Sequence, residues 1–247
     1  SRFSCEASQT CVQGCYYDNA CLLSCDKTNR CSQYCDSSEC TSTCKAGVDH
    51  CSQGFNSGVG RGTCSSKKCE QSCHADGCAA NCTDVVKECT QLSYAKKNTF
   101  FCNAFDNCLQ SCNGQASCLL ACDNAKACTQ GCYSEDCTIA CNTKVDTCTQ
   151  GCYAEDCKAT CNSKTCTQGC YGENCQVTCK SKTCDQACDQ PGCKATCTYD
   201  VDVCTQVCNA RNCVLTCNAK KCSQTCNTDD CTTIRGSGVP PPSQLRL

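Results

Sequence analysis

Residues typical of buried and of exposed positions alternate along most of the chain. In the segment from Cys157 to Cys161, a cysteine, an alanine and a second cysteine are separated by Lys158 and Thr160. Residues two apart face the same side of a β-strand, so this alternation predicts a short strand with one buried face. The residues midway between two such cysteines are small or apolar, apart from one serine: Leu23, Ser42, Ala80, Leu120, Ile139, Ala159, Val177, Ala195 and Leu215.

The alternation belongs to a repeat of 18 to 20 residues. We number the first cysteine of each unit as position 1; the other cysteines then fall near positions 5, 10 and 14, as in Cys148, Cys152, Cys157 and Cys161. Stacked coils of this kind would place the position 3 side chains inside, where amides hydrogen-bond to their copies along the axis. Position 3 is glutamine in all twelve units: Gln13, Gln33, Gln53, Gln71, Gln91, Gln110, Gln130, Gln150, Gln168, Gln186, Gln206 and Gln224.

The C-x-x-x-C segments have a helical turn as an alternative, because residues four apart also share one face of a helix. Isolated five-residue helices that contain glycine and threonine are poor ones, so strands fit better. We therefore predict an all-β fold: a flattened parallel β-solenoid of about twelve coils with a disulfide at most turns. The predicted domains are an N-terminal cap (1–10), the Cys-rich solenoid (11–231) and a Pro-rich extended tail (232–247).

Two irregular units indicate how the cysteines pair. In one unit position 5 is Phe55, in another it is Ser93, and both units also lack the cysteine at position 10. Two cysteines that are lost together, twice, are best explained as partners. Position 5 therefore pairs with position 10, as in Cys152–Cys157.

The two ends of the repeat indicate the second pairing. A single position 14 cysteine precedes the first unit, and the last unit has only positions 1, 5 and 10. Pairing position 14 with position 1 of the next unit, as in Cys161–Cys166, uses all 44 cysteines; pairing within a unit strands Cys5 and Cys222. The expected bonds at the ends are Cys5–Cys11, Cys15–Cys21, Cys25–Cys31, Cys217–Cys222 and Cys226–Cys231.

Cysteine at this density is typical of an oxidising compartment, so we expect a secreted mature protein. Thiolate metal storage is disfavoured because no two cysteines are closer than four positions and the chain has only two histidines. The net charge of −2 gives no sign of nucleic-acid binding, and no apolar stretch is long enough for membrane insertion. No catalytic set, nucleotide loop or metal site is visible. We expect no enzyme activity and no cofactor.

The irregular units also contain most of the phenylalanines. Aromatic packing in place of the lost disulfide is one interpretation, and a patch that binds a partner is the other. Three prolines in the tail enforce an extended chain, which is either frayed or docks on a neighbouring molecule. The candidate interface residues are Phe55, Tyr94, Phe100, Phe101, Phe105, Val239, Leu245 and Leu247.

Charged residues favour opposite turns. Acidic residues such as Glu155 and Asp156 follow a column of tyrosines (Tyr133, Tyr153 and Tyr171), whereas lysines such as Lys164 gather at the other turn, interrupted by aspartates. A solvated surface is the ordinary explanation of either run. Segregation onto opposite edges would also allow rods to pair side by side.

Threonine flanks many cysteines, as in Thr147-Cys-Thr149 and Thr165-Cys-Thr167. The Thr-Cys-Thr pattern and the expected cystine ladder resemble the hyperactive antifreeze proteins of beetles. Those proteins are small disulfide-rich β-solenoids whose flat threonine array binds ice. The resemblance is one of style, covers roughly residues 128–226, and implies an ice-binding face there. Around the first cysteine of a unit the full pattern occurs only twice, and the coils here are longer than in that family.

The predicted function is that of an extracellular structural protein, a stiff rod that assembles into a fibre, coat or matrix. Its expected partners are copies of itself or other components of an extracellular matrix. The alternative is a secreted ligand-binding solenoid, with ice as the most specific ligand.

Overall fold

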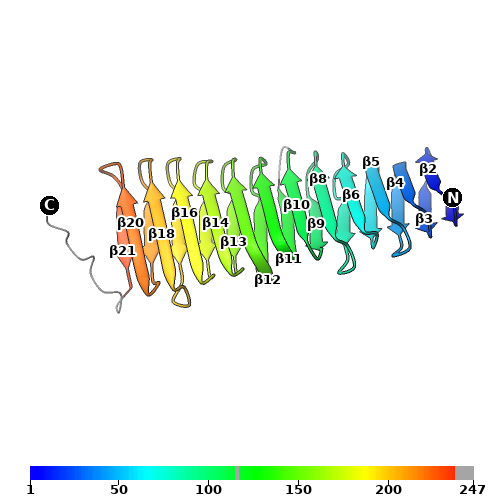
Figure 1. Cartoon of the computed structure of the whole chain (residues 1–247). Coiled ribbons are helices and arrows are strands. Elements are labelled where there is room, and N and C mark those ends of the chain that lie inside the picture. The colour runs from blue at the N-terminus through cyan, green and yellow to red at the C-terminus, as the bar shows by residue number, and fades with distance from the viewer. Residues whose placement is uncertain (115–116, 237–247) are drawn as a thin grey trace.

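The computed structural model describes residues 1–114 and 117–236, and over them the chain forms a long parallel β-solenoid (Figure 1). The coils follow one another along the rod from the N-terminal to the C-terminal side, and the described residues contain no helix. The predicted fold class is confirmed. Every pair of neighbouring strands is parallel, and one continuous sheet contains all 21 strands.

Two rows of strands form the two broad faces of the rod. The glutamine row carries positions 1 to 5, and its separate strands are β2 (Thr10–Tyr16), β6 (Lys68–Cys73), β8 (Glu88–Ser93), β10 (Asn107–Cys112), β14 (Thr165–Cys170), β16 (Thr183–Cys188), β18 (Val203–Cys208) and β20 (Lys221–Cys226). The opposite row carries positions 10 to 14, in strands β1 (Arg2–Glu6), β3 (Ala20–Asp26), β7 (Ala79–Cys82), β9 (Asn98–Asn103), β13 (Lys158–Cys161), β15 (Gln176–Cys179), β17 (Lys194–Cys197), β19 (Val214–Cys217) and β21 (Thr232–Arg235). Four longer strands pass through a turn and contribute to both rows: β4 (Arg30–Cys44), β5 (His50–Cys64), β11 (Cys118–Cys132) and β12 (Thr138–Cys152).

Equivalent repeat positions lie side by side in neighbouring coils. Cys148 pairs with Cys128 on one side and with Cys166 on the other. The ladder extends beyond the predicted solenoid boundaries, because β1 lies in register with β3 and β21 with β19. Residues 2–6 and 232–235 are therefore rungs of the same ladder. The remainder of the predicted tail, 237–247, lies outside the described residues.

In seven of the twelve units the residue just before position 10 is left-handed, and apart from Lys97 it is aspartate, asparagine or glycine. Asp136, Asp156, Asn174 and Asn212 have φ between 53° and 56°, and Gly192 has φ of 74° at the same repeat position. Aspartate, asparagine and glycine tolerate this conformation better than other residues, which explains their recurrence there.

The interior consists of two apolar columns with a polar column between them. Along one edge, the bonds between positions 14 and 1 pack with residues such as Val145 and Val201. Along the other edge, the bonds between positions 5 and 10 pack with the apolar residues at position 12, among them Leu120, Ile139 and Leu215. Cystine thus supplies much of the core that ordinary side chains supply in other folds.

The glutamines form the polar column. Each Nε2 donates to the Oε1 of the glutamine one coil before it, in eleven successive hydrogen bonds of 2.7–3.1 Å. The same Nε2 atoms also reach carbonyl groups of the opposite row, as Gln150 does with Thr160 at 3.1 Å. The predicted ladder therefore runs along the axis and also ties the two rows together.

Candidate functional surface

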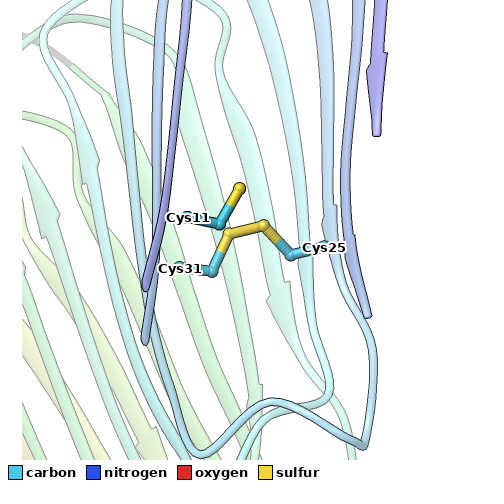
Figure 2. A group of neighbouring side chains, drawn as sticks. All are labelled: Cys11, Cys25 and Cys31. Atoms are coloured by element: carbon cyan, nitrogen blue, oxygen red, sulfur yellow. A yellow bond between two sulfur atoms is a disulfide. The ribbon is translucent and has the colours of Figure 1, made fainter. Parts of the chain in front are cut away.

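The disulfides follow both predicted rules. Position 5 is bonded to position 10 and position 14 to the next position 1, as in Cys152–Cys157 and Cys161–Cys166. The pairs at the two ends are Cys5–Cys11, Cys15–Cys21, Cys25–Cys31, Cys217–Cys222 and Cys226–Cys231. Figure 2 shows Cys25 and Cys31 joined across the interior, with Cys11 of the preceding coil beside them. Each of these sulfurs is already used in a disulfide.

One pair departs from the rule. Cys122 and Cys128 stand at positions 14 and 1, but both are buried free thiols. The prediction that all 44 cysteines are bonded is therefore wrong for this pair. Burial raises the pKa of the Cys128 thiol, and the neighbouring Cys122 raises it further through a hydrogen bond and charge repulsion. A raised pKa keeps the Cys128 thiol protonated, so it is a poor nucleophile and a poor metal ligand at neutral pH.

Phe55 replaces one missing disulfide by packing. The ring is fully buried, and in register it stands between Cys35 and Cys73. A Cβ atom added to Gly60 would come within 2.5 Å of the ring, and one added to Gly62 within 3.0 Å. The two glycines therefore leave the space that the ring fills. Of the two interpretations of this coil, aromatic packing is the one that applies to Phe55.

A hydrogen bond replaces the other missing disulfide. Ser93 and Asn98 occupy positions 5 and 10, and the Asn98 Nδ2 donates to the Ser93 Oγ at 2.8 Å. The Asn98 Oδ1 accepts a bond of 2.8 Å from the backbone N–H of Cys78 in the preceding coil. Both side chains are buried. The sequence interpretation did not include this pair, although two small polar residues at the two cysteine positions were a usable signal.

The predicted aromatic patch is not a single surface. Phe100, like Phe55, is fully buried, so neither residue is available to a partner. Tyr94, Phe101 and Phe105 are exposed, but they belong to one turn, the outer face of β9 and the opposite turn, respectively. The structure gives these three residues no common surface. The other predicted interface residues, Val239, Leu245 and Leu247, lie outside the described part of the chain.

Two of the exposed aromatics have local partners. The ring of Tyr94 stacks on that of His74 with centroids 4.6 Å apart. The ammonium of Lys126 lies 4.7 Å from the centroid of the Phe105 ring, and it also pairs with Asp106 at 2.7 Å. These contacts connect adjacent coils, so they add to the stability of the rod.

A regular face covers the outer side of β11, β12, β14 and β16. Thr129, Thr149 and Thr167 are aligned in one column, and Thr147, Thr165 and Thr183 form a second column two residues away. All six side chains are exposed. We call these six residues the threonine face.

A column of tyrosines borders this face. Tyr133, Tyr153 and Tyr171 stack in order, with ring centroids 4.5 and 4.9 Å apart. Each ring lies back over the glycine two residues before it, and a Cβ at Gly151 would come within 2.5 Å of Tyr153. The rings, these glycines and the first threonine column (Thr129, Thr149 and Thr167) line one shallow groove. We call the three residues the tyrosine stack.

The charged edges are more balanced than the sequence predicts. On the edge with the lysines, aspartates of the adjacent coil pair with them: Lys45 with Asp26, Lys67 with Asp49, Lys126 with Asp106, Lys164 with Asp146, and Lys220 with Asp202. Neutralisation within this edge reduces its attraction for an acidic edge of another rod. On the tyrosine side, the acidic residues Glu155 and Asp156 have no ion pair among the described residues.

Comparison with protein-family models, curated proteins and solved structures finds no match to this chain. The fold therefore defines its class by itself: a disulfide-rich parallel β-solenoid. Its many disulfides are typical of an oxidising environment such as the extracellular space. Over residues 1–114 and 117–236, no helix has the length and apolar character needed to cross a bilayer.

Proposed function

We propose that the protein is an extracellular structural protein, a rigid rod that assembles laterally into a fibre, coat or matrix. The observation that supports this most is the unbroken glutamine column. It runs through all twelve units, including the two that lack a disulfide between positions 5 and 10. A rod that keeps its axial connection where its edge connection is lost is suited to bear load along its length.

The proposed stiffness has two sources. Disulfides close the turns on both edges, which restricts the unfolded chain. Each small covalent loop closed in this way contributes about 2 kcal/mol to stability on a loop-entropy estimate. Buried amide bonds between coils resist sliding, because a shift of one residue would leave the amides unsatisfied. Twelve coils at about 4.8 Å would give a rod of roughly 55 Å.

Side-by-side assembly is favoured over stacking on the C-terminal side of the ladder. Arg235 stands in register with Cys217 and points toward the core position of a cysteine. Its Nε donates to the Oε1 of Gln224 at 3.3 Å, the acceptor that a further coil would use. A charged side chain turned inward at a sheet edge opposes the addition of another strand.

Negative-stain microscopy and sedimentation of the oxidised protein test this proposal. We expect rods about 55 Å long that associate laterally as the concentration rises. Removal of residues 237–247 distinguishes two kinds of contact. Assembly through a tail that binds the neighbouring molecule should be lost, whereas assembly through contacts between rod faces should remain. Rods that remain monomeric at millimolar concentration would contradict the proposed assembly.

Ice binding is the second candidate, and the threonine face favours it. Six exposed threonines in two columns form a flat array with rungs about 4.8 Å apart. Thermal hysteresis of the monomeric protein should be lost in the T149K/T167K variant. The matched T178K variant, which changes the opposite row, should retain it. Absence of hysteresis in the unchanged protein would exclude this candidate.

A further inference from the structure

The tyrosine stack is the most regular arrangement of reactive side chains on the surface. The planes of Tyr133 and Tyr153 differ by 5°, and those of Tyr153 and Tyr171 by 15°. Each tyrosine is the first residue after its strand, β11, β12 or β14, so the backbone register of the ladder sets the spacing of the rings.

The glycines fix the orientation of the three rings. In each case Cε2 is the ring atom closest to the Cβ position of the preceding glycine: Gly131, Gly151 or Gly169. The same edge of every ring therefore faces the backbone. Equivalent ring carbons consequently lie above one another in adjacent coils, including the carbons ortho to the hydroxyl group.

The rings are also accessible to reagents. Their exposed fractions are 52% for Tyr133, 46% for Tyr153 and 41% for Tyr171. Partial burial raises the pKa of the Tyr153 phenol, and the adjacent hydroxyls of Tyr133 and Tyr171 add to the shift. The Tyr153 phenol thus stays protonated at neutral pH.

We propose that the tyrosine stack is a site of oxidative cross-linking, in which a peroxidase with hydrogen peroxide joins Tyr153 to Tyr133 or Tyr171 as dityrosine. Each phenol gives up one electron and one proton, and the two radicals form one bond between ortho carbons. The hydrogen on each of these carbons then moves to the oxygen, which restores both phenols. The peroxide accepts the two electrons and two protons and leaves as two molecules of water.

The cross-link would join two adjacent coils on the outer surface, beside the disulfides between positions 5 and 10. It would resist reductants that open those disulfides. This inference concerns the isolated rod, so it stands or falls independently of lateral assembly.

Dilute oxidised protein treated with a haem peroxidase and hydrogen peroxide provides the test. After digestion, mass spectrometry should find the Tyr133 and Tyr153 peptides, or those of Tyr153 and Tyr171, joined with the loss of two hydrogen atoms. Hydrolysed product should contain dityrosine. The yield per molecule should not depend on protein concentration.

Two variants make the test specific. Y153F keeps the ring and the fold but removes the shared phenol, so the intramolecular product should fall at least tenfold. G151A keeps all three phenols but displaces the central ring, so the yield should fall severalfold. Y199F is the matched control, because Tyr199 is 70% exposed and lacks a stacked partner among the described residues, and the yield should stay unchanged.

Two outcomes would overturn the proposal. One is an equal yield of the intramolecular product in Y153F and in the unchanged protein. The other is cross-linking that occurs only between molecules, rises with concentration and is dominated by the most exposed tyrosines, Tyr17 and Tyr199.

Discussion

The coil from Cys148 to Cys161 and the coil from Cys51 to Cys64 contribute to the same two rows of strands, but different chemistry holds one edge of each. The first closes that edge with the Cys152–Cys157 disulfide. The second closes it with the buried ring of Phe55 above two glycines. A third solution, the hydrogen bond between Asn98 and Ser93, appears two coils later. The backbone ladder therefore sets the shape, and the edge closure is interchangeable.

The comparison also separates axial from lateral connections. The glutamine hydrogen bonds continue unbroken through the two irregular coils, with Gln53 to Gln33 at 3.1 Å, Gln71 to Gln53 at 2.7 Å and Gln110 to Gln91 at 2.7 Å. Loss of a disulfide between positions 5 and 10 is therefore a local event. The effect of an edge substitution on stability should therefore depend on whether a disulfide, an aromatic ring or a hydrogen bond closes that edge.

Phe55→Ala should produce the largest effect. Removal of the ring above Gly60 and Gly62 would leave a cavity lined by small residues, and such substitutions cost about 3–5 kcal/mol. We expect this decrease in the free energy of unfolding, measured by guanidinium denaturation with the disulfides intact. The control is Phe101→Ala, whose side chain is exposed on β9 and should change stability by less than about 0.5 kcal/mol. Equal effects of the two substitutions would mean that packing does not replace the disulfide.

The double variant S93C/N98C should restore the regular closure. Ser93 lies in register with Cys73 and Cys112, and Asn98 with Cys118, so the new cysteines have the backbone positions of a disulfide between positions 5 and 10. We expect spontaneous oxidation and a gain of about 2 kcal/mol over the reduced variant. Alkylation followed by mass spectrometry counts the thiols. Persistence of two free thiols in the added pair would show that this coil cannot accept the bond.

Ser93→Ala should have a smaller effect. The substitution removes the acceptor of the 2.8 Å bond, and Asn98 Nδ2 retains only a longer contact of 3.4 Å with the Ala95 carbonyl. The expected loss is about 1 kcal/mol. Hydrogen exchange should show it as faster exchange of amides in β8 and β9, while β14 remains unchanged as an internal control.

The exposed charge pairs should contribute least to either kind of coil. The hydrogen bond from Lys220 and its charge hold the pKa of Asp202 below its ordinary value, and Asp202 raises the pKa of Lys220. The contribution of Asp202 to folding stability is complete above the pKa that it has in the unfolded chain. It is lost as the pH falls through the lowered pKa of the folded protein. The contribution of Lys220 to folding stability is complete below the pKa that it has in the unfolded chain. It is lost as the pH rises through the raised pKa of the folded protein.

An NMR titration of the Asp202 carboxyl carbon would measure this coupling. In Lys220→Gln the pKa of Asp202 should rise toward the ordinary value, while amide exchange in β18 and β20 should stay the same. A marked increase of amide exchange in that variant would contradict the small contribution expected of a solvent-accessible ion pair.

The repeat made the fold and the bonded disulfide pairs predictable, because one spacing rule acts twelve times and errors in one unit are corrected by the others. Individual replacements were less predictable. Phe100 and Phe101 are adjacent, and strand alternation alone places the first inside and the second outside, as observed. Burial of Phe55 required recognition that Gly60 and Gly62, two residues apart on one face, leave room for a ring.

The pair of free thiols had no signal in the sequence. Cys122 and Cys128 have the same spacing as bonded pairs such as Cys102 and Cys108, so the pattern does not distinguish them. The pairing of lysines with aspartates of the adjacent coil could in principle have been predicted from the sequence. It depends on register between turns of different length, which the repeat numbering does not fix.

The glutamine column gives the rod a direction. Every amide in it points the same way, since each Nε2 donates toward the N-terminal side and each Oε1 accepts from the C-terminal side. Aligned amide dipoles add along an axis, so the column leaves partial positive charge at one end and partial negative charge at the other. Two rods lying side by side therefore attract when they are antiparallel and repel when they are parallel. A bundle held together in this way would have alternating orientations and no net polarity.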